Sequence, residues 1–346
     1  MAASWPQRRR AVDRLEAGPP PFADPHQWWD AVASKMPEGY DFRMMHVLGT
    51  DPIPTGIEGF DAMLDGGLRP GMHVIGGMPG MFKTGSTVWM FEHMAEAGMR
   101  PIYVTLEMPR FDIEKRMCAA WASRHRGDGA EQFSWAAGRT RPFPELDHAH
   151  GAEAKRKAAE RYIDECWATD PVLRAYEQMQ LQLAGKYAII EPDGGMCLSE
   201  LLSYIAMAGT GQTSRCIFLD YLSLLNADTD EEEQQSEYVR VSRYTRSIAK
   251  MAQKAQVPIV VVAALKKVGQ KEQEAGPSVD WFRGSSSVGY DSTSATIIMP
   301  RGSDSEAYDE RHGIRRYTWK VVKDRNGRVG DVKISAQPWS GWLGNG

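Results

Sequence analysis

The segment Gly-Gly-Met-Pro-Gly-Met-Phe-Lys-Thr-Gly-Ser-Thr (76–87) constrains the fold of this chain more than any other stretch. It follows the apolar run His73-Val74-Ile75 and precedes a predicted helix, 84–97, that ends at Gly98. A strand, a glycine-rich turn with Lys and Thr, and a helix form the pattern of a phosphate-binding loop. In such a loop the backbone N–H groups surround phosphates, the Lys reaches the outer phosphates and the hydroxyl holds Mg²⁺.

One position departs from the usual loop, because Phe82 stands where a Gly commonly precedes the Lys. A positive φ at this position would cost Phe about 1–2 kcal/mol, although its N–H would stay available. The Phe82 ring would then pack over the nucleotide or against a neighbouring subunit. The alternative is a glycine-rich turn that arose by chance and binds nothing. The residues expected to bind the nucleotide are Gly77, Gly80, Met81, Phe82, Lys83, Thr84 and Gly85.

From residue 53 onward, apolar segments rich in Val, Ile and Tyr alternate with helical patterns. Runs such as Val-Pro-Ile-Val-Val-Val-Ala-Ala-Leu are typical of strands buried on both faces. The fold class predicted from this alternation is α/β, with a mostly parallel twisted sheet between helices and a C-terminal β-hairpin around Asp-Arg-Asn-Gly-Arg-Val. The predicted strands are 72–76, 101–106, 187–191, 215–220, 257–263, 294–299, 316–323 and 330–336.

The remaining segments are less regular. Residues 109–186 are expected to be mostly helical, 236–255 to form a long helix, and the acidic stretch 228–237 to be a solvated loop. We expect two parts, an N-terminal arm over 1–50 and an ATPase domain over 51–346. The arm contains a predicted short helix, 24–36, that packs on its own domain or reaches a neighbouring subunit.

Composition excludes several classes of protein. The 346 residues suffice for one large domain or two modest ones, with 42% apolar and 25% charged residues. A net charge of −4 argues against a uniformly basic nucleic-acid binder but allows local basic loops. We expect no membrane partner, because no apolar run approaches the ~20 residues of a membrane span. The four cysteines lack metal-type spacing, which favours a reduced, cytoplasmic setting.

Two acidic residues stand at the ends of predicted strands. Glu107 follows Ile-Tyr-Val-Thr-Leu, and Asp220 ends Cys-Ile-Phe-Leu. Ligands of open parallel sheets bind at the carboxyl ends of the strands. One carboxylate at this edge can hold Mg²⁺ through water, and another can polarise an attacking water molecule. Taken singly, each could equally be a helix cap or a surface acid.

At this point several motifs resemble one family in order and spacing. The segments are Ile53–Thr84, Thr-Leu-Glu-Met, Phe-Leu-Asp-Tyr-Leu-Ser-Leu-Leu and Val-Val-Lys-Asp-Arg-Asn-Gly-Arg-Val-Gly-Asp-Val. They are similar to the motor domain of DnaB-type hexameric replicative helicases, which are RecA-like P-loop NTPases. The resemblance runs from about residue 53 to about residue 337. The collar domain that precedes the motor in this family has no counterpart in the 50 residues before it, and Ala264 stands where the family has a Gln sensor.

The resemblance implies a role for each matching residue. Lys83 and Thr84 would bind the phosphates of ATP and Mg²⁺, Asp220 would be the second metal-site residue, and Glu107 would be the catalytic base. Lys323 and Arg325 would act on the nucleotide of the next subunit, with Arg325 as the arginine finger. From the residues alone, Lys-Asp-Arg-Asn-Gly-Arg is better explained as a hairpin turn with solvated charges.

The resemblance also implies a DNA-binding loop over 263–291. Its basic residues can follow a phosphodiester backbone without reading bases. The expected DNA-binding residues are Lys266, Lys267, Lys271 and Arg283, and a mobile solvated loop is the alternative. The function implied is an ATP-dependent helicase or translocase that acts as a homo-hexameric ring on single-stranded DNA, alongside other replication proteins, as in phage or plasmid replication. The alternative is a RecA-like regulatory or recombination ATPase that does not unwind DNA.

Overall fold

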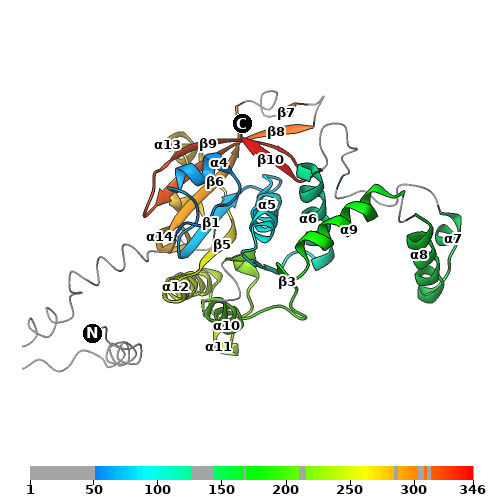
Figure 1. Cartoon of the computed structure of the whole chain (residues 1–346). Helices are drawn as coiled ribbons and strands as arrows, with labels where there is room; N and C mark the ends of the chain where they lie inside the picture. The colour runs from blue at the N-terminus through cyan, green and yellow to red at the C-terminus, as the bar shows by residue number, and fades with distance from the viewer. Residues whose placement is uncertain are drawn as a thin grey trace, which may run out of the picture. The chain divides into compact units, whose positions relative to one another are not determined.

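A computed structural model describes residues 51–125, 134, 143–166, 169–209, 216–283, 287–302, 308–309 and 313–345 (Figure 1). The predicted arm and its helix at 24–36 lie outside this range. In the part that is described, no helix is long and apolar enough to span a membrane.

The centre of the fold is one twisted sheet whose strands follow the order β10-β9-β8-β6-β1-β5-β4-β2-β3. The strands from β6 to β3 pair in parallel, and the strands at the other edge pair antiparallel. The parallel strands are β1 (Gly71–Gly77), β2 (Ile102–Thr105), β3 (Ala188–Ile190), β4 (Ile217–Asp220), β5 (Pro258–Ala264) and β6 (Ser294–Pro300). β8 (Ile314–Asp324) and β9 (Gly330–Gln337) form the predicted hairpin.

Helices cover one face of this sheet, where they pack against the side chains of alternate residues of the strands. Ile75, Tyr103, Phe218 and Val260 point to this face and belong to one apolar cluster. The helices over it are α5 (Lys83–Glu96), α6 (Arg110–His125) and α9 (Pro171–Leu183), as Figure 1 shows.

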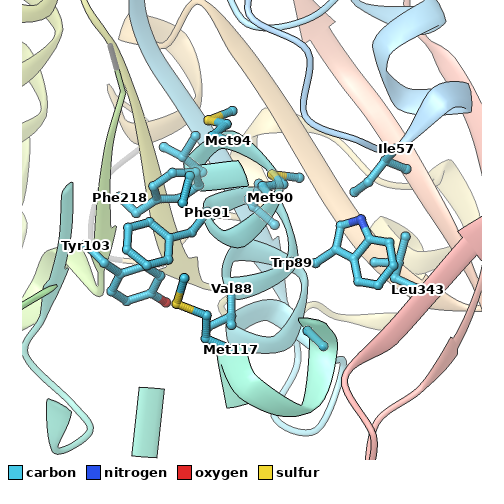
Figure 2. Packing of buried hydrophobic residues seen from close by; sticks show 14 of the residues in the cluster. Ile57, Val88, Trp89, Met90, Phe91, Met94, Tyr103, Met117, Phe218 and Leu343 are labelled. Carbon is cyan, nitrogen blue, oxygen red and sulfur yellow. The ribbon is translucent and has the colours of Figure 1, made fainter. Parts of the chain in front are cut away.

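The centre of this face is the apolar side of α5. Figure 2 shows Phe91 of α5 lying against Tyr103 and Phe218, with Met90, Met94 and Met117 around it. The centroid of the Phe91 ring lies 5.3 Å from that of Tyr103 and 5.8 Å from that of Phe218, both edge to face. Burial of each large side chain of this kind stabilises the fold by about 1.5–3 kcal/mol. The packing therefore holds α5, and the loop before it, firmly on the sheet.

The opposite face is covered by α12 (Glu237–Ala255), which contacts β1 and β5, and by α10 (Leu198–Ala208), which packs on α12 and joins the same apolar cluster. Val74, Val104, Leu219 and Val261 point to this side, so neighbouring residues of the same strands serve different faces. Strands buried on both faces need continuous apolar runs, and this is why the segments lack the alternation of a half-exposed strand.

Smaller elements complete the described chain. They are α4 (Glu58–Met63), α7 (Pro144–Asp147), α8 (Ala152–Cys166), α11 (Asp230–Glu233), α13 (Gln270–Ala275), α14 (Ser287–Asp291), the 3-10 turns η1 (Leu222–Leu224) and η2 (Val279–Trp281), β7 (Tyr308–Asp309) and β10 (Trp342–Asn345). α7 and α8 share a small apolar cluster of their own, formed by Phe143, Tyr162 and Cys166.

The structure confirms the α/β class and every predicted strand to within about two residues at each end. The prediction missed the short strands β7 and β10. It was also wrong about the acidic stretch, because α11 forms there and Glu232 is buried with a 2.8 Å ion pair to Arg243. A carboxylate is stable inside a protein only when it has such a partner.

Candidate active site

The phosphate-binding loop connects β1 to α5 at the carboxyl edge of the parallel strands. Gly80 has a φ of 79° and Phe82 a φ of 58°, so both adopt the left-handed conformation. Apart from its two chain neighbours, no described heavy atom lies within 4 Å of the position that a Cβ on Gly80 would take, so the positive φ and not lack of space favours glycine there. α5 begins at Lys83, and a helix N-terminus offers unpaired N–H groups and a favourable potential to anions.

The predicted strain at Phe82 is present, and the side chain is held by packing. Its ring is nearly parallel to that of Tyr317 on β8, at 9°, with centroids 6.4 Å apart. The ring also lies over Gly85, where an added Cβ would come within 2.1 Å of it. Gly85 is therefore needed for the Phe82 ring to occupy this place.

Lys83 lies beside the loop that it would complete around a phosphate. Its Nζ donates a hydrogen bond of 3.2 Å to the carbonyl of Met78, across the mouth of the loop. Burial lowers the pKa of the Lys83 amine, while Asp220 and Glu107 oppose this. A phosphate group would add negative charge at the same point and favour the charged amine.

Thr84 and Asp220 meet across the sheet although they are far apart in sequence. The Thr84 hydroxyl donates to Asp220 Oδ2 at 2.7 Å, and the Tyr103 hydroxyl donates to the same oxygen at 3.1 Å. Asp220 Oδ1 is buried and has no hydrogen-bond partner among the described residues. Burial raises the pKa of the Asp220 carboxyl, and its two hydrogen bonds oppose this.

This pair fits Mg²⁺. A buried carboxylate oxygen without a donor, next to a hydroxyl, provides the hard oxygen ligands that Mg²⁺ takes. The remaining positions of the ion would be filled by water and phosphate oxygens. Within the described residues no three His, Cys, Asp or Glu side chains gather as a closed metal site.

The loop opens into a cleft of about 540 Å³. Glu107 lies at its edge, two residues after β2 ends, and Arg116 of α6 also lines it. Burial lowers the pKa of the Arg116 guanidinium, while Tyr103, Asp112, Asp220 and Glu107 oppose this. The other lining residues are Pro79, Gly80, Met81, Phe82, Lys83, Thr84, Gly85, Met108, Tyr221, Val262, Ala263, Ala264, Arg283 and Pro338.

The expected DNA-binding residues lie in different surroundings. Arg283 lines the cleft, donates its main-chain N–H to the carbonyl of Ala264 at 2.8 Å, and approaches Glu237 at 3.8 Å. Lys266 forms an ion pair of 2.9 Å with Glu272, and Lys267 is exposed. Lys271 belongs to α13, and its side chain lies outside the described residues.

Lys323 and Arg325 do not line the cleft of their own chain. The Lys323 amine donates to the carbonyls of Gly289 and Tyr290, and Arg325 donates to the carbonyl of Asp291 at 3.3 Å. Both side chains thus lie at the C-terminal end of α14. These hairpin charges are more ordered than those of a purely solvated turn, and they lie outside the cleft that would bind phosphates in the same chain.

Comparison with known proteins agrees with this geometry. The family model described as "DnaB-like helicase C terminal domain" matches residues 168–340, which is half of the chain. The chain belongs to the DnaB-like helicase C-terminal domain family. The matched residues include β5 and β6, the two strands that lie on either side of β1 in the sheet. The phosphate-binding loop follows β1, so the loop and the matched segment belong to the same sheet.

Individual relatives support the membership. The chain is 25% identical over 289 residues to the replicative DNA helicase DnaB of Leifsonia xyli subsp. xyli, covering 82% of this chain and 54% of that protein. It is 22% identical to a probable plasmid replicative DNA helicase of Chlamydia psittaci, covering 86% and 57%. The chain therefore spans about half the length of these curated relatives.

Solved structures show the same fold. One solved ATPase domain superimposes with a TM-score of 0.64 at 18% identity, over 91% of this chain and 97% of that one. A DnaB-like replicative helicase, solved in a study of its interactions with primase, superimposes with a TM-score of 0.64 at 17% identity, over 98% and 74%. These likenesses confirm the predicted RecA-like fold of the DnaB helicases.

Sequence reasoning missed several residues of the cleft. Arg116 is nine residues after Glu107, on the helix that leaves the same strand end, and this placement was a usable signal. Tyr103, buried beneath the cleft, carried no such signal, because a tyrosine in an apolar strand is expected to be core, and its hydroxyl reaches Asp220 of the neighbouring strand β4. Pro338, after β9, comes to the cleft only through the sheet order.

Proposed function

We propose that this chain is the ATP-hydrolysing motor of a DnaB-type helicase that acts as a ring on single-stranded DNA during replication. One observation carries the proposal. Lys83, Thr84 and Glu107 line one cleft at the carboxyl ends of the parallel strands, and the buried Asp220 accepts a hydrogen bond from Thr84 beneath it, in a chain of the DnaB-like family.

Each residue has a role that its surroundings support. The loop amides and Lys83 bind the phosphates of ATP, and Thr84 with Asp220 holds Mg²⁺, which when bound neutralises phosphate charge. Glu107, exposed at the edge of the cleft, orients the attacking water molecule and accepts its proton. Arg116, from the same side as Glu107, lies where it can stabilise charge on the outermost phosphate.

Lys323 and Arg325 complete the site of the next subunit. Their position against α14, outside their own cleft, leaves them available to a neighbour in a ring. An arginine supplied in this way stabilises the charge that develops on the transferred phosphoryl group. Hydrolysis then depends on assembly, and a homo-hexamer is the ring that the family membership supports.

The loop between β5 and β6 is the proposed contact with single-stranded DNA. Lys266, Lys267, Lys271 and Arg283 would bind phosphates by charge, without base preference. Arg283 also lines the nucleotide cleft, so this residue joins the two sites. Other replication proteins are the expected partners of such a motor.

The test measures ATP hydrolysis with and without single-stranded DNA. Wild-type protein should hydrolyse ATP, faster when DNA is present, and should displace a strand from a forked duplex. Lys83→Ala should lose nucleotide binding. Glu107→Gln should keep binding but lose at least about 10²-fold in turnover, since general base catalysis contributes that much.

The matched control is Glu114→Gln, which changes an acidic residue of α6 that does not line the cleft. Its turnover should equal that of the wild type. An ATPase rate that does not change when DNA is added, together with no strand displacement, would reject the helicase proposal and favour an ATPase of regulatory function.

A further inference from the structure

We propose that the Phe82 ring, backed by Tyr317, is the platform on which the base of the nucleotide stacks, and that it sets the preference of the site for a nucleoside triphosphate over bare phosphates. This inference rests on the proposed function and concerns the part of the cleft that phosphate chemistry leaves unassigned.

The strand order fixes the direction in which a bound nucleotide lies. Asp220 ends β4 and Glu107 follows β2, so both acidic groups lie on the β5–β4–β2 side of β1, while Lys83 begins α5 directly after the loop that leaves β1. Phe82 and its partner Tyr317 point to the opposite side, where β6, β8 and β9 lie. A triphosphate whose outer phosphates meet the charged side must direct its sugar and base toward β8.

The wall on this second side is apolar. Met81 and Phe82 from the loop and Pro338 after β9 line the cleft there. The flat faces of aromatic side chains stack with any base, because every base presents a π face. A charged phosphate gains nothing from such a wall, since it would lose water without gaining a hydrogen bond.

The Phe82 ring is held in place for this role. Tyr317, only 2% exposed, lies nearly parallel behind it, while Phe82 itself is half-buried and faces the cleft. The ring also covers the first turn of α5 at Gly85. A base that stacks on this ring therefore lies beside the helix N-terminus that binds its phosphates.

The backbone at Phe82 gives an independent reason to look for a role. With a φ of 58°, residue 82 has a conformation that suits glycine and costs Phe about 1–2 kcal/mol. Strained residues of this kind gather at ligand sites when the surrounding structure holds them. Within the chain, stacking on Tyr317 holds Phe82 in this conformation. A bound nucleotide would hold it further by stacking its base on the ring.

The experiment compares ATP with inorganic tripolyphosphate, both with Mg²⁺, by calorimetry on the full chain. Phe82→Leu keeps a Cβ, and therefore the same backbone strain, and keeps an apolar side chain. It removes the flat aromatic ring on which a base could stack. Because stacking of a base on an aromatic ring strengthens binding, ATP should bind Phe82→Leu about tenfold more weakly than it binds the wild type, which corresponds to about 1.4 kcal/mol. Tripolyphosphate should bind both proteins within about twofold of each other.

The control variant is Phe111→Leu, which removes an exposed aromatic ring that does not line the cleft. Its affinities should match the wild type. Light scattering of Phe82→Leu should show unchanged mass, and a lower mass with unchanged ATP affinity would overturn the proposal by making Phe82 a contact between subunits. Equal weakening for ATP and tripolyphosphate would also overturn it, because the ring would then act only on the loop.

A second measurement needs no variant. Irradiation of wild-type protein with 8-azido-ATP should attach the base to residues near Phe82, Tyr317 or Pro338, located by mass spectrometry. Attachment near Glu107 or Arg116 would overturn the proposed direction of the nucleotide. If the wild type bound neither ATP nor tripolyphosphate, the proposed function itself would fail, and that outcome differs from every result above.

Discussion

At the scale of single residues, two buried carboxylates show how surroundings decide what an acid does. Asp220 has one oxygen without a partner among the described residues and lies beside the cleft, which suits a metal ligand. Glu92, on α5, has both oxygens bonded to Arg124, at 2.6 and 2.5 Å, and does not line the cleft. Glu92 therefore belongs to the core of the fold, and its charge affects stability.

Glu92 predicts a pH dependence of stability. Burial raises the pKa of its carboxyl from 4.5 to about 7, against the opposing effect of Arg124. Between these values the folded protein binds more protons than the unfolded chain, so the free energy of unfolding falls as pH rises. Between pH 5 and pH 7.5, the free energy of unfolding of Glu92→Gln should fall by about 2 kcal/mol less than that of the wild type, as measured by urea unfolding.

The control for this prediction is Glu96→Gln, which removes the other acidic partner of Arg124, 2.8 Å away. The fall with pH should persist in this variant because Glu92 remains. Parallel curves for wild type and Glu92→Gln would contradict the prediction and place the pH dependence elsewhere.

At the scale of elements, α12 shows how local chemistry sets the ends of a helix. Ser236 caps its start by accepting a hydrogen bond from the Val239 N–H. At its end Gln256 adopts a left-handed conformation, with a φ of 57°, in the position where glycine is usual. The helix must stop there because the next residues enter β5.

This end of α12 offers a stabilising substitution. Gln256→Gly should raise the free energy of unfolding by about 0.5–1 kcal/mol, since relief of the left-handed conformation exceeds the entropy cost of glycine. Gln253→Gly, one turn earlier and inside the helix, should instead lower it by about 1 kcal/mol. Chemical denaturation of both variants checks the sign, and a loss of stability in Gln256→Gly would contradict the explanation.

At the scale of the whole molecule, we propose that contacts between subunits complete the site. Arg325 and Lys323 are held by carbonyls of α14, and α14 forms the last part of the proposed DNA loop between β5 and β6. Burial and the nearby Arg325 lower the pKa of the Lys323 amine. One short helix therefore connects the proposed DNA contact with the residues proposed to act on a neighbour.

Mixed assemblies test this arrangement. Arg325→Ala should bind ATP like the wild type but lose about 10³-fold in turnover, the range expected for an arginine finger. Mixing Arg325→Ala with the inactive Lys83→Ala should restore part of the activity, because some interfaces then combine an intact loop with an intact Arg325. Absence of any recovery, in mixtures shown to share rings, would contradict action between subunits.

The parts that sequence predicts well are those with local causes. Apolar runs predicted the strands, and the glycine-rich segment with Lys83 and Thr84 predicted the loop that joins β1 to α5, because strand burial and loop geometry depend on adjacent residues. That this loop binds phosphate stays a prediction. The sequence left open whether Phe82 has a positive φ, and the structure shows that it does. The strand-end rule correctly grouped Glu107 and Asp220 at one edge of the sheet.

Other features depended on the tertiary structure. The order of the strands brings Tyr317 behind Phe82, Tyr103 to Asp220 and Arg116 into the cleft, and no local pattern encodes these pairings. The burial of Glu232 likewise required Arg243 from another helix. Sequence determined which chemical groups this protein has and where each strand ends; the packing of distant strands decided which groups meet, because side-chain contacts across a sheet follow spatial order and not order along the chain.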